Sequence, residues 1–201
     1  MKTRIAVLVS GGGTNLQALI DAQGKPLNSG EIGLVVANNA SAYALERAKK
    51  AGIATAVVLK KECGSQAAFE EKLKQVLDAH GVQHIILAGF MTILTEGFTS
   101  RYPKRILNVH PSLIPSFCGE GYYGLKVHEE ALRYGVKVTG ATVHFVNEIP
   151  DGGEIIAQKA VYIEPGDTPE ILQRRVMEQA EWILLPQAAE AVSASIMEET
   201  K

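Results

Sequence analysis

Residues 5–15 read Ile5-Ala6-Val7-Leu8-Val9-Ser10-Gly11-Gly12-Gly13-Thr14-Asn15. The continuous apolar run at the start of this stretch is typical of a strand buried on both faces of a parallel sheet. Leu16, Leu19 and Ile20 then recur at helical spacing. Thr14 or Asn15 is the expected N-cap. The stretch therefore predicts a strand, a glycine loop and a helix, the repeating unit of an α/β fold.

The alternation of strand and helix continues through the first half of the chain. Apolar runs predict strands over residues 32–37, 54–58 and 85–87, and helical spacing predicts a helix over residues 43–51. Ser65 is the expected N-cap of a further helix that ends at Gly81. Repeated units of this kind predict a parallel sheet with helices on both faces.

The second half predicts a pair of antiparallel strands followed by a helix. Residues 138–146 alternate so that Thr142 and His144 face one way, as in a half-buried strand. Residues 154–163 are its expected antiparallel neighbour. The final helix should begin with Thr168 as N-cap, and Pro186 should kink or divide it.

Length and composition favour one cytoplasmic domain over residues 1–201. Hydrophobic residues make up 46% of the chain and charged residues 21%, which is ordinary globular usage, and the net charge of -2 argues against a nucleic-acid partner. Cys63 and Cys118 show no metal-ligand spacing, so no metal site is expected. The N-terminus contains neither a signal-peptide pattern nor a membrane-spanning run.

The glycine loop is a candidate phosphate site at Gly12, Gly13, Thr14 and Asn15. Backbone N–H groups and the dipole of the following helix favour an anion there. The loop matches neither a Walker A motif nor the G-x-G-x-x-G pattern. A tight structural turn is the alternative.

Residues 107–117 read Leu107-Asn108-Val109-His110-Pro111-Ser112-Leu113-Ile114-Pro115-Ser116-Phe117. Asn108 and His110 project from the same side of an extended chain at the expected end of a strand. Together they are able to polarise a carbonyl and move a proton. The alternatives are a turn-capping asparagine and a structural histidine. In the same way, Asp151 has the pattern of an ordinary turn residue. His144 fits equally well as a structural strand histidine whose ring is hydrogen-bonded.

Taken together, four motifs resemble the glycinamide ribonucleotide formyltransferase family over nearly the whole chain. They are the stretch from Val9 to Ala18, Leu87-Ala88-Gly89-Phe90-Met91, Asn108-Val109-His110-Pro111-Ser112-Leu113, and Thr142-Val143-His144-Phe145 with Asp151-Gly152-Gly153. The resemblance implies a Rossmann-like three-layer α/β fold with a mostly parallel central sheet and an antiparallel C-terminal strand pair. It also implies a phosphate-binding half before about residue 100 and a catalytic and folate-binding half after it.

The resemblance further implies formyl transfer from 10-formyltetrahydrofolate to the amine of glycinamide ribonucleotide. The family's catalytic residues fall on Asn108, His110 and Asp151, and Glu181 resembles an acidic residue that contacts the ribonucleotide. The folate-binding positions fall on Gln66, Leu87, Phe90, Met91, Thr92, Ile93, Leu94, Asn108, Val143 and Asp151, with the backbone from Val143 to Asp151 as hydrogen-bonding partner of the pterin. Direct transfer through a tetrahedral intermediate, without a metal, by a monomer or homodimer is expected. An Asp151 carboxylate beside His110 should raise the pKa of that imidazole.

The chain departs from the family pattern at three places. The loop from Phe117 to His128 is several residues longer, and the Glu181 assignment needs one extra residue and puts Trp182 where a histidine is usual. Gln66 stands where an arginine often reaches the glutamate tail of folate, which leaves Lys60 or Lys61 as candidates for that role. Two other functions remain open: hydrolysis of 10-formyltetrahydrofolate, and a non-catalytic phosphate- or nucleotide-binding module.

Overall fold

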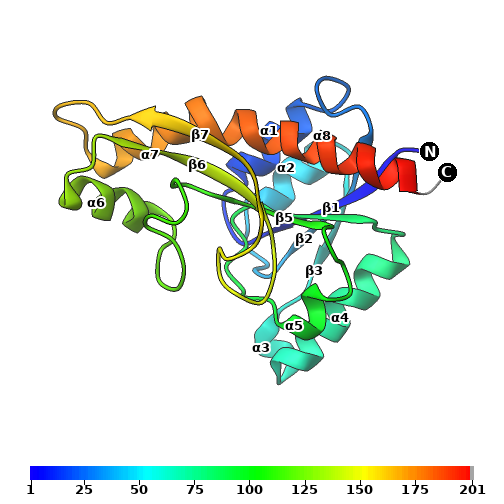
Figure 1. Cartoon of the computed structure of the whole chain (residues 1–201). Helices are drawn as coiled ribbons and strands as arrows, with labels where there is room; N and C mark the ends of the chain where they lie inside the picture. The colour runs from blue at the N-terminus through cyan, green and yellow to red at the C-terminus, as the bar shows by residue number, and fades with distance from the viewer. Residues whose placement is uncertain (200–201) are drawn as a thin grey trace.

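The computed structural model describes residues 1–199, and within them it contains a seven-stranded sheet in the order β3-β2-β1-β4-β5-β6-β7 (Figure 1). The strands are β1 (Thr3–Val9), β2 (Gly30–Ala37), β3 (Ala54–Val57), β4 (His84–Leu87), β5 (Ile106–His110), β6 (Val138–Phe145) and β7 (Ile155–Tyr162). Neighbours from β3 to β5 are parallel, whereas β6 runs antiparallel to both β5 and β7. The predicted mostly parallel sheet with an antiparallel C-terminal pair is confirmed.

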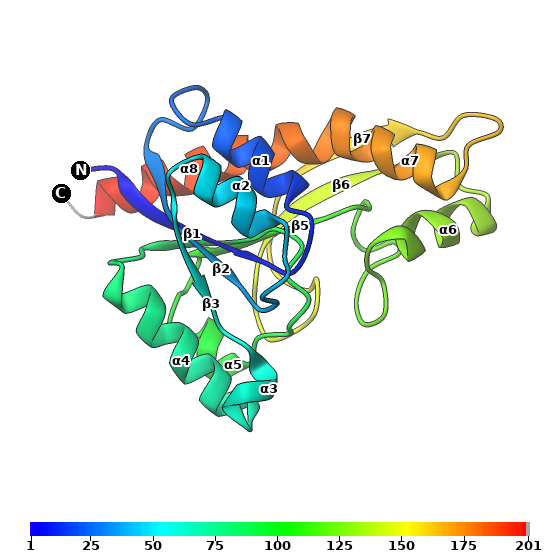
Figure 2. The same cartoon turned by 180° about the vertical axis from the view of Figure 1, so that it is seen from behind.

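Helices cover both faces of the parallel part of the sheet (Figures 1 and 2). One face carries α1 (Thr14–Asp21), α2 (Ala44–Lys50) and α8 (Trp182–Glu199), and the other carries α3 (Lys60–Cys63), α4 (Gln66–Ala79) and α5 (Glu96–Thr99). The helices α6 (Leu125–Tyr134) and α7 (Pro169–Val176) lie beside the far ends of β6 and β7. The three-layer arrangement therefore follows the expectation.

Two hydrophobic cores explain the continuous apolar run that begins the chain. Ile5, Val7 and Val9 point into the core beneath α1 and α8, while Ala6 and Leu8 point into the core beneath α4. Because successive side chains of a strand face opposite sides, a strand with helices on both faces needs apolar residues at every position. The interpretation of residues 5–9 as a doubly buried strand is confirmed.

Helix α1 begins differently from the prediction. Its N-cap is Gly13, in the left-handed conformation with φ 72°, and no side chain caps it, so the expectation of Thr14 or Asn15 as N-cap is wrong. A Cβ atom at position 13 would lie only 2.6 Å from the Ala44 Cβ, which explains why glycine is needed there. The predicted caps Ser65 and Thr168 are confirmed, since each side chain accepts a hydrogen bond from a first-turn amide.

The C-terminal helical region is interrupted at a place other than Pro186. A π-helical turn, η1 (Met177–Glu181), separates α7 from α8, and α8 continues through Pro186. A π-helical turn holds one more residue than an α-helical turn. Within residues 1–199 no helix has the length and apolar character to cross a membrane.

His84 is a buried polar residue that couples the stability of this fold to pH. It begins β4, is fully buried, and has its Nδ1 atom 3.1 Å from the Ser193 hydroxyl. Burial lowers the pKa of His84 from 6.5 to about 3. Between these values the unfolded chain binds a proton that the folded chain does not, so the folded state loses stability as pH falls through this range.

We expect His84→Asn, which keeps a hydrogen-bonding group near Ser193, to weaken the pH dependence of the unfolding free energy. At pH values of about 4 to 6 the slope should fall by about 1.4 kcal/mol per pH unit, which corresponds to one proton. Urea unfolding curves recorded at several pH values measure that slope. A variant with the slope of the unmodified protein would contradict a neutral, buried His84.

Candidate functional site

The loops after β1, β2 and β4 meet at the carboxyl edge of the sheet. The Ser10 hydroxyl accepts a hydrogen bond from the Met91 amide at 2.8 Å, and the Ser10 amide donates to the Gly89 carbonyl at 3.2 Å. The Asn38 side chain donates to the Thr92 hydroxyl at 2.9 Å. Ligands of open α/β sheets bind at this edge, and the hydrogen bonds fix the shape of the edge here.

The polar residues at the end of β5 lie on one face of the sheet together with residues of β6. Asn108 is paired with His144 and His110 with Thr142, so all four side chains project from the same face. Val109 and Val143 point the other way, into the core. The prediction that Asn108 and His110 project together is confirmed, although both belong to the strand rather than to the segment after it.

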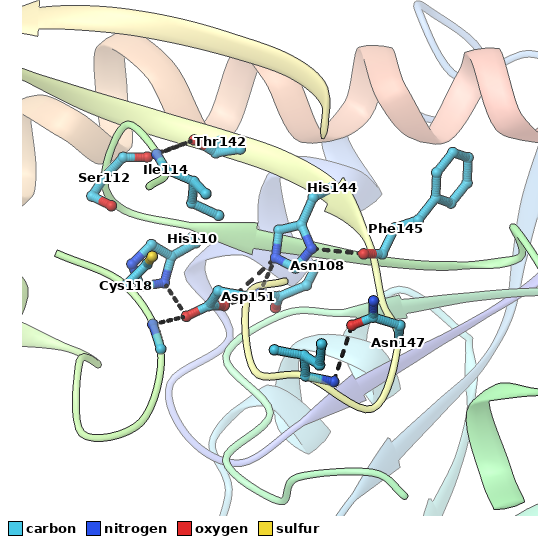
Figure 3. Close-up of polar contacts among 12 residues, drawn as sticks. Asn108, His110, Ser112, Ile114, Cys118, Thr142, His144, Phe145, Asn147 and Asp151 are labelled. Carbon is cyan, nitrogen blue, oxygen red and sulfur yellow. Dashed lines mark hydrogen bonds and ion pairs between the residues drawn. The ribbon is translucent and has the colours of Figure 1, made fainter. Parts of the chain in front are cut away.

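Asp151 reaches this cluster from the turn between β6 and β7 (Figure 3). Its Oδ2 atom lies 3.4 Å from His110 Nδ1, and its Oδ1 atom lies 3.5 Å from His144 Nε2. The Asn108 amide nitrogen donates to Oδ1 at 3.4 Å, and the Gly119 amide donates to Oδ2 at 2.9 Å. The structure thus brings together the three predicted catalytic residues, and it adds His144.

The turn that presents Asp151 depends on an unusual backbone. Asp151 has φ 56°, a left-handed conformation that aspartate tolerates better than most residues. Gly153 lies so close to β6 that a Cβ atom there would collide with the Phe145 carbonyl. The Pro-Asp-Gly-Gly sequence therefore both turns the chain and directs the carboxylate toward β5.

His110 is buried and is held from two sides. Its Nε2 atom lies 2.8 Å from the Phe117 carbonyl oxygen, which can only accept, so Nε2 carries the proton and Nδ1 faces Asp151. Burial lowers the pKa of His110, and this outweighs the opposite effects of the Asp151 charge and the Phe117 hydrogen bond. The expectation of a raised pKa is therefore wrong, even though the two side chains are neighbours.

The Asp151 carboxyl group is ionised at neutral pH despite being largely buried. Burial raises its pKa, but the neighbouring His144 side chain, the nearby His110 and the Gly119 amide together lower the pKa below its usual value. A buried carboxylate is stable only where donors surround it. The cluster therefore combines a fixed negative charge with an uncharged imidazole at His110.

The long loop after β5 contributes backbone groups to the cluster rather than side chains. The Phe117 carbonyl and the Gly119 amide are its two contacts with the cluster. Phe117 has φ 50°, and its ring packs against Tyr122 and Tyr134 at centroid distances of 6.4 and 6.1 Å. These aromatic contacts hold the loop against α6, so the sequence departure at this loop bears directly on His110 and Asp151.

The glycine loop and Glu181 form a second polar group. The Asn15 side chain donates to Glu181 Oε2 at 2.7 Å, and burial raises the pKa of Glu181 to about 7. Asn15 Oδ1 and Trp182 Nε1 are buried without a hydrogen-bond partner among residues 1–199. Arg47 supports the loop through a 2.8 Å hydrogen bond from its Nε atom to the Gly12 carbonyl. Unused polar atoms of this kind fit a polar ligand.

A small slot lies beside the cluster and contains six of the ten predicted folate positions. Its volume is about 110 Å³, and it is lined by Leu87, Thr92, Ile93, Leu94, Asn108, His144, Val146, Asn147, Ile149, Pro150 and Asp151. Phe90 and Met91 do not line it. The Val143 side chain is buried in the core on the opposite side of β6, so the predicted folate contact at this position would involve its backbone and stays a prediction.

Gln66 supports the slot from behind instead of lining it. Its amide donates to Glu70 Oε1 at 2.7 Å and to the Ile93 carbonyl at 3.1 Å. Glu70 in turn accepts hydrogen bonds from the amide and hydroxyl of Thr95. The Gln66 side chain therefore holds the loop after β4, and its predicted role in folate binding stays a prediction.

His144 is the site residue whose function the sequence left open. Its alternation with Thr142 predicted the correct face, but only the pairing of β6 with β5 puts it opposite Asn108. Asn147, Ile149 and Pro150, which belong to the predicted backbone range from Val143 to Asp151, also line the slot. Across residues 1–199 no group of three or more His, Cys, Asp or Glu side chains has a metal-binding arrangement.

Comparison with known proteins gives consistent matches. The chain is 45% identical over 197 residues to the trifunctional purine biosynthetic protein adenosine-3 of Gallus gallus, which covers 98% of this chain but only 19% of that longer protein. It is 44% identical over 176 residues to the phosphoribosylglycinamide formyltransferase of Haemophilus influenzae, covering 88% of this chain and 81% of that protein.

Solved structures agree with the sequence relatives. Glycinamide ribonucleotide transformylase 1 from Symbiobacterium toebii is 40% identical, with a TM-score of 0.90, over 96% of this chain and 89% of that chain. The Coxiella burnetii phosphoribosylglycinamide formyltransferase is also 40% identical, with a TM-score of 0.89. A family model described as formyl transferase matches residues 3–188. By these matches the chain belongs to the formyl transferase family.

Proposed function

We propose that this chain transfers the formyl group of 10-formyltetrahydrofolate to the amine of glycinamide ribonucleotide. The observation that carries the proposal is the convergence of Asn108, His110 and Asp151 beside an open slot at the carboxyl edge of the sheet. The names of the relatives point to the same activity. The slot would take the folate, used as a diffusible cosubstrate, and the glycine loop would take the phosphate of the ribonucleotide.

The first step is attack of the amine nitrogen on the formyl carbon, which makes a tetrahedral oxyanion. His110 Nδ1 and Asp151 Oδ2 are two acceptors 3.4 Å apart. Together they are suited to receive the N–H groups of the amine, whose nitrogen becomes positively charged as it attacks. The lowered pKa of His110 leaves this ring uncharged before reaction, and therefore able to remove a proton from the amine as the new C–N bond forms. The Asn108 amide stabilises the oxyanion.

The second step breaks the bond between the formyl carbon and the folate nitrogen. The proton that His110 took from the substrate amine is transferred to the folate nitrogen, directly or through water. The folate therefore leaves as a neutral amine. Asp151 stabilises the imidazolium between the two steps. The formyl group stays bonded to the substrate amine, and no covalent intermediate with the protein is needed.

Glu181 and the glycine loop would hold the ribonucleotide. The free amides at the start of α1 favour the phosphate, and Glu181 is held beside the loop by Asn15. Its carboxylate is able to accept hydrogen bonds from sugar hydroxyls. These contacts to the phosphate and the sugar would orient the ribonucleotide so that its amine points toward β5.

The transferase is distinguished from a 10-formyltetrahydrofolate hydrolase by whether cofactor loss depends on the amine. The chain should consume 10-formyltetrahydrofolate rapidly only when glycinamide ribonucleotide is present, with formylated ribonucleotide formed in equal amount. Absorbance of the folate product and mass spectrometry of the ribonucleotide measure the two yields. Loss of cofactor at the same rate without the amine would indicate the hydrolase.

His110→Ala should lower kcat by about 10²- to 10⁴-fold, because it removes the group that transfers the proton. Asp151→Asn should also lower kcat, since it removes the charge that stabilises the imidazolium. Steady-state rates at neutral pH measure both effects. His80→Ala is a matched control, because the hydrogen bond of the His80 ring goes to the Val76 carbonyl of α4 rather than to the cluster. Undiminished turnover by His110→Ala would contradict the catalytic role of His110.

Gly13→Ala should raise KM for glycinamide ribonucleotide by roughly tenfold or more, because the new Cβ atom would meet Ala44 and distort the phosphate loop. KM for the folate should stay unchanged. Gly24→Ala is the control, since Gly24 shares the left-handed backbone, with φ 86°, but has open space around it. Equal KM values for the two variants would rule out the phosphate assignment of the loop.

A further inference from the structure

We propose that His144 is a positioning residue that holds the Asn108 amide with its nitrogen, rather than its oxygen, toward the reacting centre. This inference rests on the proposed formyl transfer and assigns a task to a residue that the mechanism above does not use. It follows from the hydrogen bonds on the two sides of the His144 ring (Figure 3).

The His144 ring is held tightly between β5 and its own strand. Its side chain is only 2% exposed. The Nδ1 atom lies 2.7 Å from the Phe145 carbonyl oxygen, and the Nε2 atom lies 3.1 Å from the Asn108 Nδ2 atom. The charged or titratable groups facing it are Asp151 and His110, which carry the predicted catalytic chemistry. The ring therefore has one contact on each nitrogen and little room to turn.

The Phe145 carbonyl determines which nitrogen carries the proton. A carbonyl oxygen only accepts hydrogen bonds, so Nδ1 must donate. In the uncharged ring Nε2 then carries no proton and can only accept a hydrogen bond. The group that faces it at 3.1 Å must be a donor, and this selects the Nδ2 end of the Asn108 amide. If the amide were rotated by half a turn, two acceptors would face each other.

The anchored amide has a second N–H group available for the reaction. At rest Asn108 Nδ2 also contacts Asp151 Oδ1, but at 3.4 Å, which is long for a hydrogen bond. Asn108, His144 and Asp151 all line the slot. The formyl oxygen, as it becomes an oxyanion, is a stronger acceptor for this N–H group than the distant carboxylate oxygen. A rotated amide would instead present its own oxygen to the oxyanion and repel it.

A proton on Nε2 would reverse this arrangement. The imidazolium would place a second donor against Nδ2, and the amide would turn to present Oδ1. His144 therefore controls whether Asn108 acts as a donor or an acceptor toward the substrate. Its contact with the reaction is indirect, through Asn108, and this separates it from His110 and Asp151.

The test compares His144→Leu, which has no acceptor, with His144→Gln, whose Oε1 atom can take the place of Nε2. His144→Leu should lower kcat by about tenfold or more, less than the 10²- to 10³-fold typical of removing such a donor altogether. KM for glycinamide ribonucleotide should change by less than about twofold, since His144 lies at the folate slot rather than at the glycine loop. His144→Gln should recover most of the lost kcat. A Gln variant as slow as the Leu variant would overturn the proposal.

The double variant separates positioning from a general structural role. In the Asn108→Ala background, His144→Leu should cause no further loss of kcat, because the amide that it positions is already absent. An additional loss as large as that in the unmodified background would show that His144 does not act through Asn108. Wild-type kcat in the single His144→Leu variant would overturn the proposal as well.

An NMR measurement tests the orientation without relying on activity or on the folding of a variant. Nitrogen-15 spectra of the unmodified protein should show His144 with a protonated Nδ1 and an unprotonated Nε2 at neutral pH. The opposite tautomer, or a doubly protonated ring, would overturn the proposal. If the protein fails to transfer formyl groups but shows the expected tautomer, the proposed function is wrong while the orientation of Asn108 stands.

Discussion

The Asp151 carboxylate lies between two imidazoles, 3.4 Å from His110 and 3.5 Å from His144. A buried charge of this kind is stable only if surrounding groups replace the water that it has lost. Here the Gly119 amide and the Asn108 side chain supply donors. The partners come from β5, β6 and the long loop after β5, so one charge requires three separate segments to be in place together.

The reversal of direction between β5 and β6 makes this cluster possible. Antiparallel pairing brings Asn108 opposite His144 and His110 opposite Thr142, with all side chains on one face. Thr142 is fully buried and holds the segment after β5, because it donates to the Ser112 carbonyl and accepts from the Ile114 amide. The same two strands thus supply the reacting groups and the hydrogen bonds that fix the loop beside them.

A second long-range contact joins the beginning of the chain to its end. Asn15 and Glu181 are separated by 166 residues, and they meet because η1 directs Glu181 toward the glycine loop. π-Helical turns occur frequently at functional sites, where they accommodate an extra residue inside a helix. The glycine loop, proposed for the phosphate, and Glu181, proposed for the sugar, are therefore held together by this buried contact.

The sequence by itself determined the sheet, because apolar runs and glycine loops reflect local preferences and burial that recur along the chain. The resemblance of four local motifs to a known family also predicted Asn108, His110 and Asp151 as site residues. Tertiary structure decided three further points. The burial of His110 lowers the pKa of a ring that its charged neighbour alone would raise. The register of β6 pairs His144 with Asn108, and the Val143 side chain packs into the core on the other face instead of lining the slot. Burial and cross-strand pairing depend on residues distant in the chain, so neither can be predicted from a local sequence pattern.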